Sequence, residues 1–598
     1  MKDDESKDAW YAVALGRMTV SFGGVFCGWR ELGRRSGAVI CLGLALSFAS
    51  GMKAQDPMAE VVGAIMARVA LEDASRGNHV LSIEDGYDAL LWRVHLIRQA
   101  KQSIDLQTFI WKNDESGRLM ICELVEAARR GVRVRIIADH MVSDQNPEVG
   151  AFLATVSPHL EVRHYRPVMA RLNPTLVQKL SAMVWGFYGT NQRMHNKLMV
   201  VDGTVMLTGG RNIENTYFNH GTGMNFRDRD VIAVGPVAAE AAASFETYWD
   251  FKHTVPSAEL KDVATVIAGG AFPRYATRDD YDFGGLFGAL QEEADNEELM
   301  KARFWARLRQ ADRVEFIHDE PGKGRGFFSS DSNTTVELRK QVGLARTEIV
   351  VQTPYLILSK TARKLAAKLK RNFPELRIRI STNSYASTDN IMAYSANYRL
   401  RSDYVGKLGL EVYEFKPHPG SLRELMPQYD EAAQRAVADK VSKPPFLCLH
   451  AKSLVVDGRL SFVGSYNLDP RSVSLNTEVG LIIEDEAFAQ ELQEKIELDM
   501  APGSSWVIAK REFPLGLRAV NSLIDGTLSL SPIDVWPIQN SSSFELRPGE
   551  ESVPRGHPEF YSRFREVGDF PGADATLTSK GILTRFYKAV GAVFTPIM

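Results

Sequence analysis

The sequence contains one polar segment twice, and this repeat limits the possible folds more than any other feature. Each copy has the order His-x-Lys, then Asp five residues after the lysine, then Asn ten residues after the aspartate. The second copy starts 255 residues after the first (450 − 195), and every member keeps its place. Such a repeat predicts two similar halves in one chain. Its members are His195, Lys197, Asp202 and Asn212 in the first copy, and His450, Lys452, Asp457 and Asn467 in the second.

The residues between these positions predict a strand, a tight turn and a return strand. A histidine and a lysine two residues apart on an extended chain project to the same side. Apolar residues follow each lysine, and the two Asp-Gly pairs at 202–203 and 457–458 are typical of hairpin turns. Small residues after each return strand let the backbone approach a ligand closely. We therefore assign the backbone of a phosphate pocket to Gly209, Gly210, Gly464 and Ser465.

Two such segments facing each other bring two imidazoles, two ammonium groups and two amides around one pocket. Ammonium and amide groups are suitable hydrogen-bond donors to phosphate oxygens. Two imidazoles can divide nucleophilic and acid–base roles near neutral pH. We expect phosphoryl transfer without a metal or other cofactor, because clustered lysines repel a cation and no HExxH or Cys/His zinc spacing occurs. A purely structural repeat is the alternative, but it would preserve apolar residues and glycines rather than His, Lys and Asn.

Helical and extended patterns alternate ahead of both copies. In the first part of the chain, the patterns predict helices at 87–100 and 117–130 and strands at 103–111 and 132–138. Later, predicted strands at 348–353 and 376–381 flank a predicted helix at 360–370. This alternation predicts an α/β fold.

Composition and pattern divide the chain into six predicted segments. Arg34 and Arg35 precede a short apolar run at 38–49, which is typical of a secretory signal or a short membrane anchor, with a buried helix as the alternative. The apolar end at 581–598 fits either a membrane surface or a packed terminal helix. The segments are a leader (1–55), a connector (56–79), the first half (80–260), a linker or insertion (261–325), the second half (326–502) and a C-terminal extension (503–598).

Charge and cysteine content weigh against two classes of protein. The formal net charge is −3, and no basic tract occurs, which disfavours a dedicated nucleic-acid binder. The four cysteines include no CxxC pair, and two of them, Cys27 and Cys41, lie in the predicted leader. We therefore expect no disulfide framework and no nucleic-acid partner.

The two repeated segments resemble the HKD motifs of the phospholipase D superfamily over residues 80–260 and 330–500. The stretch SYNLDPRS at 465–472, followed by Asn476-Thr477-Glu478, is similar to the second motif of bacterial cardiolipin synthases. The stretches 382–389 and 411–417 resemble the C-type subgroup of these synthases. The resemblance implies two pseudo-twofold-related halves, each a mixed β-sheet flanked by helices, with one active site shared between them.

The resemblance also implies a two-step mechanism through a phosphohistidine. It assigns His195 as the nucleophile and His450 as the general acid and base, although the sequence alone leaves their order open. In this superfamily an acidic residue downstream of each motif orients a histidine. We match these acids to Asp230 and Glu478, with Asp228 as the competing choice for the first. The aspartates of the two motifs are interpreted as structural residues of the turns, with direct catalysis as the alternative.

Several functions remain open at this point. The first hypothesis is a cardiolipin synthase or related phosphatidyltransferase that uses phosphatidylglycerol, and also phosphatidylethanolamine, at a membrane surface. A hydrolytic phospholipase D would use water as the acceptor, and a metal-independent nuclease would need a basic groove, for which Arg129, Arg130, Arg133 and Arg135 are the local candidates. A silent membrane-binding protein is a further alternative. The leader predicts attachment to the bacterial inner membrane or a periplasmic location, and the oligomeric state stays open.

Overall fold

The computed structural model describes residues 77–185, 187–283, 286–324, 332–512 and 539–572. The predicted leader, nearly all of the predicted connector and the apolar end at 581–598 lie outside the described residues. No helix within these ranges combines the length and apolarity needed to cross a bilayer.

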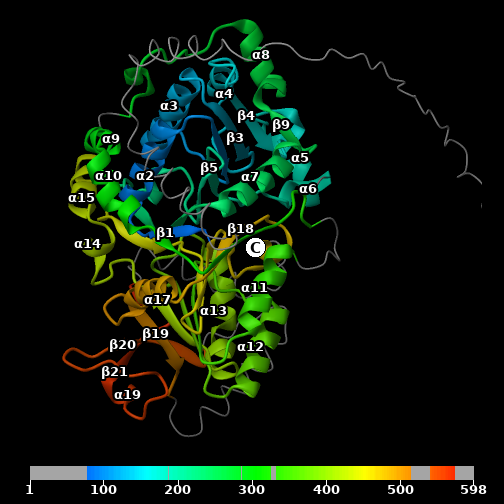
Figure 1. Cartoon of the computed structure of the whole chain (residues 1–598). Helices are drawn as coiled ribbons and strands as arrows, with labels where there is room; N and C mark the ends of the chain where they lie inside the picture. The colour runs from blue at the N-terminus through cyan, green and yellow to red at the C-terminus, as the bar shows by residue number, and fades with distance from the viewer. Residues whose placement is uncertain (1–76, 186, 284–285, 325–331, 513–538, 573–598) are drawn as a thin grey trace, which may run out of the picture. The chain divides into compact units, whose positions relative to one another are not determined.

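The first half is built on a nine-stranded mixed sheet (Figure 1). Its strands in spatial order are β10 (Arg309–Gln310), β1 (His79–Ile83), β8 (Asp230–Val234), β6 (Val205–Gly209), β5 (Leu198–Val201), β2 (Ser103–Thr108), β3 (Arg133–Asp139), β4 (Leu160–Tyr165) and β9 (Thr254–Pro256).

The second half is built on a ten-stranded mixed sheet. Its strands in spatial order are β11 (Arg313–His318), β18 (Val479–Glu484), β17 (Leu460–Gly464), β16 (Ser453–Val456), β12 (Glu348–Gln352), β13 (Arg377–Asn383), β14 (Glu411–Phe415), β19 (Ser505–Lys510), β20 (Ser541–Leu546) and β21 (Phe564–Gly568).

The two sheets repeat one topology. The eight strands from β1 to β9 in the first sheet correspond in order to the eight from β11 to β19 in the second. Each neighbouring pair also has the same orientation in both sheets, with parallel pairs at β2–β3–β4 and β12–β13–β14 and antiparallel pairs elsewhere. This correspondence confirms the predicted α/β fold with two related halves.

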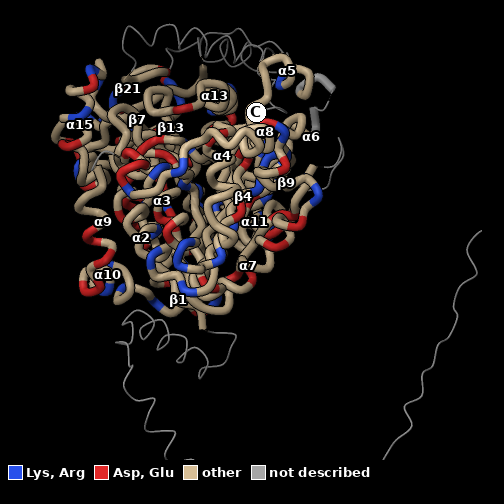
Figure 2. Tube along the Cα trace, turned by 90° about the horizontal axis from the view of Figure 1, so that it is seen from above, with Lys and Arg blue, Asp and Glu red and all other residues tan. Residues whose placement is uncertain are grey.

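Helices cover the outer face of each sheet at equivalent places in the chain. In the first half these are α2 (Gly86–Gln99) and α3 (Glu115–Arg129), and in the second α11 (Asn333–Gly343) and α12 (Lys360–Asn372) (Figure 1). Asp85 and Asp114 cap α2 and α3 with their side chains, and Gly131 follows α3 with a φ of +94°, which favours glycine. Lys, Arg, Asp and Glu are interspersed over the described chain (Figure 2).

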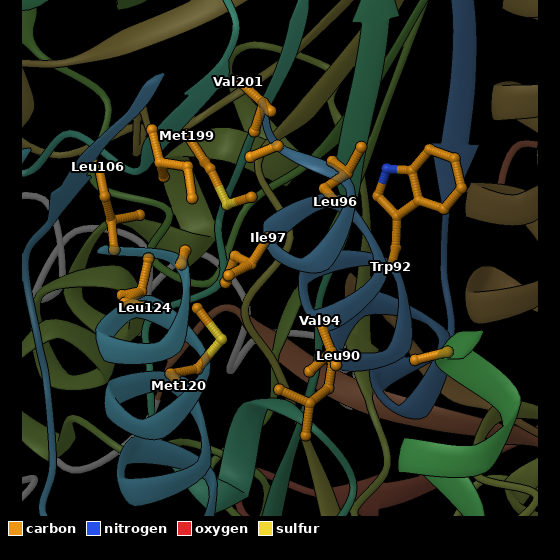
Figure 3. Packing of buried hydrophobic residues seen from close by; sticks show 14 of the residues in the cluster. Leu90, Trp92, Val94, Leu96, Ile97, Leu106, Met120, Leu124, Met199 and Val201 are labelled. Atoms are coloured by element: carbon orange, nitrogen blue, oxygen red, sulfur yellow. The ribbon is translucent and has the colours of Figure 1, made fainter. Parts of the chain in front are cut away.

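Strand alternation builds the layered core. On β5, Leu198 and Val200 face the core that joins both sheets, whereas Met199 and Val201 face α2 and α3 (Figure 3). The shared core also contains buried residues of α7 (Pro236–Trp249) and α17 (Glu486–Met500). Because one apolar core includes both sheets, the halves are held firmly against each other.

Two predicted boundaries differ from the structure. The predicted linker contains α8 (Lys261–Gly269), α9 (Gly288–Asp295) and α10 (Glu297–Arg303), but it also contains β11, the first strand of the second sheet. The second half therefore begins before residue 326. In the predicted C-terminal extension, β19, β20 and β21 continue that sheet, and the helix α19 (Phe560–Arg563) lies between the last two strands in the chain. Because β19 pairs with both β14 and β20, the second sheet extends beyond residue 502.

Candidate active site

Each repeated motif lies against a backbone segment of the opposite half. Met194 forms a parallel bridge with Thr477, and the amide of His195 donates to the Thr477 carbonyl over 3.1 Å. In the reciprocal contact, β15 (Phe446–Leu449) pairs in parallel with β7 (Met224–Arg227). The amide of His450 then donates to the Arg227 carbonyl over 2.8 Å. These contacts place each histidine beside the residue that follows in the other half, namely Glu478 or Asp228.

The first histidine is paired with a carboxyl group of the second half. His195 Nδ1 lies 2.9 Å from Glu478 Oε2. The same carboxyl group accepts hydrogen bonds from the hydroxyls of Ser465 (2.5 Å) and Ser472 (2.7 Å), and it is fully buried. Sequence reasoning predicted Glu478 but assigned no role to Ser472, which lies in the short helix α16 (Pro470–Ser474). The two hydroxyls fix the position of the carboxyl group that contacts the imidazole.

The second histidine is paired with a carboxyl group of the first half. His450 Nδ1 lies 2.6 Å from Asp228 Oδ2, and both side chains are buried. A Cβ atom added at Gly210 would lie 2.1 Å from Asp228 Oδ1. Glycine is therefore required at this position because the carboxylate packs directly against the backbone. A Cβ at Gly209 or Gly464 would equally collide with the neighbouring strand, at 2.3 Å and 2.4 Å.

The predicted choice of Asp230 as the first orienting acid is wrong. Asp230 Oδ2 instead accepts from Arg93 over 2.9 Å and lies 3.4 Å from an Arg211 nitrogen. The sheet register explains the error, because Gly209 pairs with Asp230 whereas the equivalent Gly464 pairs with Gly480. The residue equivalent to Glu478 is thus two positions before Asp230, which is Asp228. An alignment of the two halves that matches Asp230 to Gly480 would have matched Asp228 to Glu478.

The two carboxyl groups differ in charge state. Burial raises the pKa of Glu478 to about 8, although nearby Lys323 and Lys197 oppose the rise. Burial also disfavours the charged form of Asp228, but His450, Lys452 and Arg211 outweigh it and hold the pKa of that carboxyl far below its usual value. At neutral pH Asp228 is ionised, whereas Glu478 is largely protonated.

The lysines of both motifs point back at their own histidines. Lys197 Nζ donates to the His195 carbonyl over 2.8 Å, and Lys452 Nζ contacts the His450 carbonyl and lies 2.8 Å from its Nδ1. Because Nδ1 of His450 donates to an ionised carboxylate, it cannot also accept from Lys452, so we assign the lysine's hydrogen bond to the carbonyl. Burial lowers the pKa of both lysines, that of Lys452 to about 8, and their mutual repulsion lowers that of Lys197 further.

Aromatic rings pack against both imidazoles. Phe109 contacts His195 edge to face, with centroids 4.7 Å apart, and its ring also lies 4.9 Å from Lys197 Nζ. Tyr217 and Phe226 contact His450 at 5.1 Å and 4.9 Å. Burial and the adjacent lysines lower the pKa of both histidines. A carboxyl group contacts Nδ1 of each ring, and neither Nε2 has a hydrogen-bond partner among the described residues. The Nε2 atom of each histidine is therefore available to a substrate.

The two motif asparagines behave differently from each other. Asn212 donates from Nδ2 to the Tyr217 hydroxyl over 2.8 Å and accepts from the Ile110 amide, so its amide is already engaged. We had expected it to donate to phosphate, and the structure gives it a structural role instead. Asn467 is buried, and its Oδ1 has no hydrogen-bond partner within the described residues.

The motif aspartates lie in the two hairpin turns, as predicted. Asp202 and Asp457 have φ values of +50°, each followed by a glycine with positive φ. The Asp202 carboxylate accepts from the backbone amides of residues 101, 102 and 103 at 2.7–2.9 Å. Asp457 accepts in the same way from the amides of residues 346, 347 and 348. Both side chains are thus engaged in tying the turn to the loop before the neighbouring strand.

Other reactive groups in the described part of the chain add no second site. Cys122 and Cys448 are buried free thiols. No three His, Cys, Asp or Glu side chains of the described ranges come together as a metal site. Three of the four arginines considered for a nucleic-acid groove are engaged elsewhere: Arg135 pairs with Asp105 and Glu246, Arg129 pairs with Glu126, and Arg130 donates to the carbonyls of residues 97 and 98.

Comparison with known proteins agrees with this geometry. A family model described as "Cardiolipin synthase, PLD-like domain" matches residues 94–249 and 338–500. Cardiolipin synthase C of Escherichia coli K12 is 32% identical over 417 residues, covering 68% of this chain and 82% of that protein. Cardiolipin synthase B of Salmonella typhi is 23% identical over 430 residues, covering 70% and 80%.

A solved structure of phosphatidylserine synthase from Haemophilus influenzae Rd KW20 aligns with a TM-score of 0.47 at 15% identity, covering 73% of this chain and 90% of that one. The family model matches each half of the chain over a segment that contains its histidine motif. The chain therefore belongs to the cardiolipin synthase family of phospholipase D-like phosphatidyltransferases.

Proposed function

We propose that this protein makes cardiolipin by moving a phosphatidyl group from one phosphatidylglycerol to a hydroxyl of another, through a phosphohistidine on His195. One observation carries the proposal: each imidazole is held at Nδ1 by a carboxyl group of the opposite half, at 2.9 Å and 2.6 Å. This arrangement leaves two Nε2 atoms and two ammonium groups for one phosphodiester. Relatives named cardiolipin synthase C and B support the choice of product.

The first step transfers the phosphatidyl group to the protein. The Nε2 lone pair of His195 attacks phosphorus, and the bond from phosphorus to the headgroup glycerol oxygen breaks. That oxygen takes the proton from Nε2 of a protonated His450 and leaves as free glycerol. The ammonium groups of Lys197 and Lys452 balance the charge that develops on the phosphoryl oxygens.

The second step transfers the phosphatidyl group to the acceptor lipid. The headgroup hydroxyl of a second phosphatidylglycerol gives its proton to His450 Nε2 and attacks phosphorus. The nitrogen–phosphorus bond then breaks, which releases cardiolipin and restores both histidines. With phosphatidylethanolamine as donor, ethanolamine leaves in place of glycerol. Water is neither used nor formed.

The electrostatic difference between the two pairs supports this division of roles. A general acid must hold a proton. Burial and Lys452 lower the pKa of His450, but the ionised Asp228 opposes that shift and favours the imidazolium form. A nucleophilic histidine must be neutral. Burial and the charges of Lys197 and Lys452 lower the pKa of His195 well below its usual value, and the largely protonated Glu478 adds little negative charge to oppose them. His195 therefore suits the nucleophilic role and His450 the acid–base role.

A hydrolytic phospholipase D would run the same first step and use water in the second. An enzyme favours transfer over hydrolysis when it keeps water out of the site and holds the acceptor hydroxyl in line with the phosphorus–nitrogen bond. Attachment at the bacterial inner membrane or in the periplasm remains a prediction from the leader sequence.

The test incubates the purified full chain with phosphatidylglycerol, with phosphatidylethanolamine, with both lipids, and with single-stranded DNA, and separates the products by mass. We expect cardiolipin and glycerol in equal amounts from phosphatidylglycerol alone. Phosphatidic acid as the sole product would assign hydrolysis instead. Cleaved DNA beside intact lipid would overturn the proposal.

A further inference from the structure

Large apolar side chains protrude into solvent on the segment that leads from β4 into the first motif. This segment contains the short helix η1 (Val168–Ala170) and the helix α5 (Leu176–Trp185). The exposed fractions are 73% for Leu176 and 75% for Val177, and 54–55% for Leu180 and Met169. They account for four of the eight large exposed apolar side chains in the described part of the chain, so they form a concentrated patch rather than scattered residues.

The same segment has an unusual charge composition. Residues 162–201 contain no Asp or Glu, although these two types make up 74 of the 598 residues of the chain. They do contain six cations: Arg163, Arg166, Arg171, Lys179, Arg193 and Lys197. In Figure 2, α5 is drawn mainly in the tan of uncharged residues. Arg163 and Arg193 pair with Glu161 and Asp139, and Lys197 is buried in the first motif, which leaves Arg166, Arg171 and Lys179 as the cations beside the apolar helix. An apolar helix flanked by such cations is complementary to an anionic lipid surface.

The patch is mounted rigidly on the first half. Thr175 and Gln178 exchange reciprocal hydrogen bonds at the start of α5, at 2.9 Å and 3.3 Å, in the manner of a capping box. The Asp262 carboxylate accepts from the backbone amides of residues 172 and 173, each at 2.8 Å. Lys179 Nζ donates to Gln145 over 2.9 Å. The exposed side chains are thus displayed by a fixed backbone.

A short, well-anchored connection joins the patch to the nucleophile. After α5, helix α6 (Phe187–Asn191) ends four residues before His195. Arg193 contacts the α6 carbonyl of Gly189 at 3.3 Å and pairs with Asp139 at 3.3 Å. Asp139 also accepts from the Met194 amide over 3.0 Å. These contacts fix the segment just before the first motif to α6 and to the end of β3.

The equivalent connection in the second half has a different character. It runs from β14 to β15 and contains α14 (Leu422–Leu425) and α15 (Tyr429–Ala438). Four acids interrupt its cations, namely Glu424, Asp430, Glu431 and Asp439. Its Val437 is 78% exposed, which makes that residue a matched control for Val177.

We propose that η1 and α5 dock the protein onto an anionic phospholipid bilayer, with Met169, Leu176, Val177 and Leu180 inserted among the acyl chains. The inference rests on the proposed function, because docking beside the first motif brings lipid headgroups to the histidines. A symmetric contact with a second copy would instead bring two acid-free cationic segments together, which like-charge repulsion disfavours.

The direct test places an environment-sensitive NBD dye at position 177 or, as the control, at position 437. Both Val→Cys variants carry His195→Ala, to prevent turnover, and Cys27→Ser and Cys41→Ser, because the remaining cysteines are buried. On vesicles of phosphatidylglycerol we expect a blue shift at 177 and quenching by brominated acyl chains, with neither effect at 437. No shift at 177 would overturn the proposal. A shift at 177 without vesicles, lost on dilution, would assign the patch to a second copy and would also overturn it.

A kinetic test separates docking from chemistry. Replacing Leu176, Val177 and Leu180 together by serine should lower the rate on phosphatidylglycerol vesicles about ten-fold or more. The rate on short-chain phosphatidylglycerol below its micelle concentration should stay within about two-fold, which also shows that the variant is folded. An unchanged vesicle rate would overturn the docking proposal while the proposed function stands. Failure of the unaltered protein to convert the short-chain lipid would instead count against the proposed function.

Discussion

The two halves of the protein repeat the same strand order, yet they supply their partner histidines with carboxyl groups of opposite charge state. Asp228 of the first half is ionised beside His450, whereas the pKa of Glu478, beside His195, is raised to about 8. Both carboxyl groups are buried and both touch an imidazole Nδ1. At Asp228 the charges of His450, Lys452 and Arg211 outweigh the effect of burial, whereas at Glu478 burial prevails over Lys323 and Lys197.

Two pairs of equivalent positions beside these carboxyl groups carry different residues. The small-residue motif reads Gly-Gly-Arg-Asn at 209–212 and Gly-Ser-Tyr-Asn at 464–467. The buried Arg211 guanidinium lowers the pKa of Asp228, while its equivalent Tyr466 is uncharged. Ser465, at the place of Gly210, donates a hydrogen bond to Glu478 that opposes the rise in its pKa. The duplicated scaffold has thus kept its chain path while the surroundings of its two carboxyl groups differ.

The largest expected effect is the loss of either histidine. His195→Ala and His450→Ala should each lower kcat on phosphatidylglycerol by about 10⁴-fold or more, because each removes a group that acts on the reacting atoms. Product formation followed by mass, with thermal melting to check the fold, measures this loss. The exposed His557→Ala serves as the control and should retain full rate. An unchanged rate of product formation by His195→Ala would contradict its role as the nucleophile.

The carboxyl partners should differ from each other when their charge is removed. Asp228→Asn should lower kcat about 10²–10⁴-fold at pH 7, because it removes the anion that favours the His450 imidazolium. Glu478→Gln should cost about ten-fold or less, since the glutamine resembles the protonated acid that it replaces. Steady-state rates of the two variants measure the difference. Equal losses, or a larger loss for Glu478→Gln, would contradict the assigned asymmetry.

The raised pKa of Glu478 also predicts a pH-dependent stability. Between its ordinary pKa of 4.5 and about 8, the folded state keeps a proton that the unfolded chain has lost. The stabilising contribution is therefore complete below pH 4.5, falls as the pH rises, and is lost above about 8, with a total on the order of 5 kcal/mol. Urea denaturation of the unaltered protein and Glu478→Gln between pH 5 and 9 measures it. Lys452 also titrates in this range, and the Glu478 charge opposes the lowering of its pKa by burial, so the difference between the two proteins includes the change in the pKa of that lysine. Parallel stability curves would refute the raised pKa.

The smallest expected effect is on the two motif aspartates. Asp202→Asn and Asp457→Asn should each lower the free energy of unfolding by about 1–2 kcal/mol, because a charged acceptor of three backbone amides becomes neutral. Asparagine tolerates the positive φ of these turns, so the backbone should keep its path. The value of kcat should stay within about three-fold. A large fall in kcat with unchanged stability would restore the catalytic alternative.

Local pattern predicted most of the first half with boundaries close to the structure. The helix expected at 87–100 is α2 (Gly86–Gln99), and the strand expected at 132–138 is β3 (Arg133–Asp139). The hairpin turns were also predictable because Asp-Gly favours positive φ at both positions. Such elements are specified by residues close together in the sequence.

The errors concern pairings between distant residues. The choice of Asp230 over Asp228 depended on the register of β8 against β6. The sequence of one strand does not specify this register when the strands on both sides of it are apolar. The engagement of Asn212 by Tyr217 and the role of Ser472 depend on how loops fold back onto the site. Each histidine contacts a carboxyl group of the opposite half. This pairing likewise depends on how the two sheets are assembled and not on either motif alone.

Trapping of the covalent intermediate tests most directly whether two imidazoles from opposite halves serve one phosphorus atom. With a phosphatidyl donor whose leaving group is p-nitrophenol, the first step needs no general acid. His450→Ala should then release about one equivalent of p-nitrophenol in a burst, and peptide mass analysis should find the phosphatidyl group on the peptide that contains His195. His195→Ala should give neither the burst nor the adduct. An adduct on any other residue, or a burst without an adduct, would contradict the account.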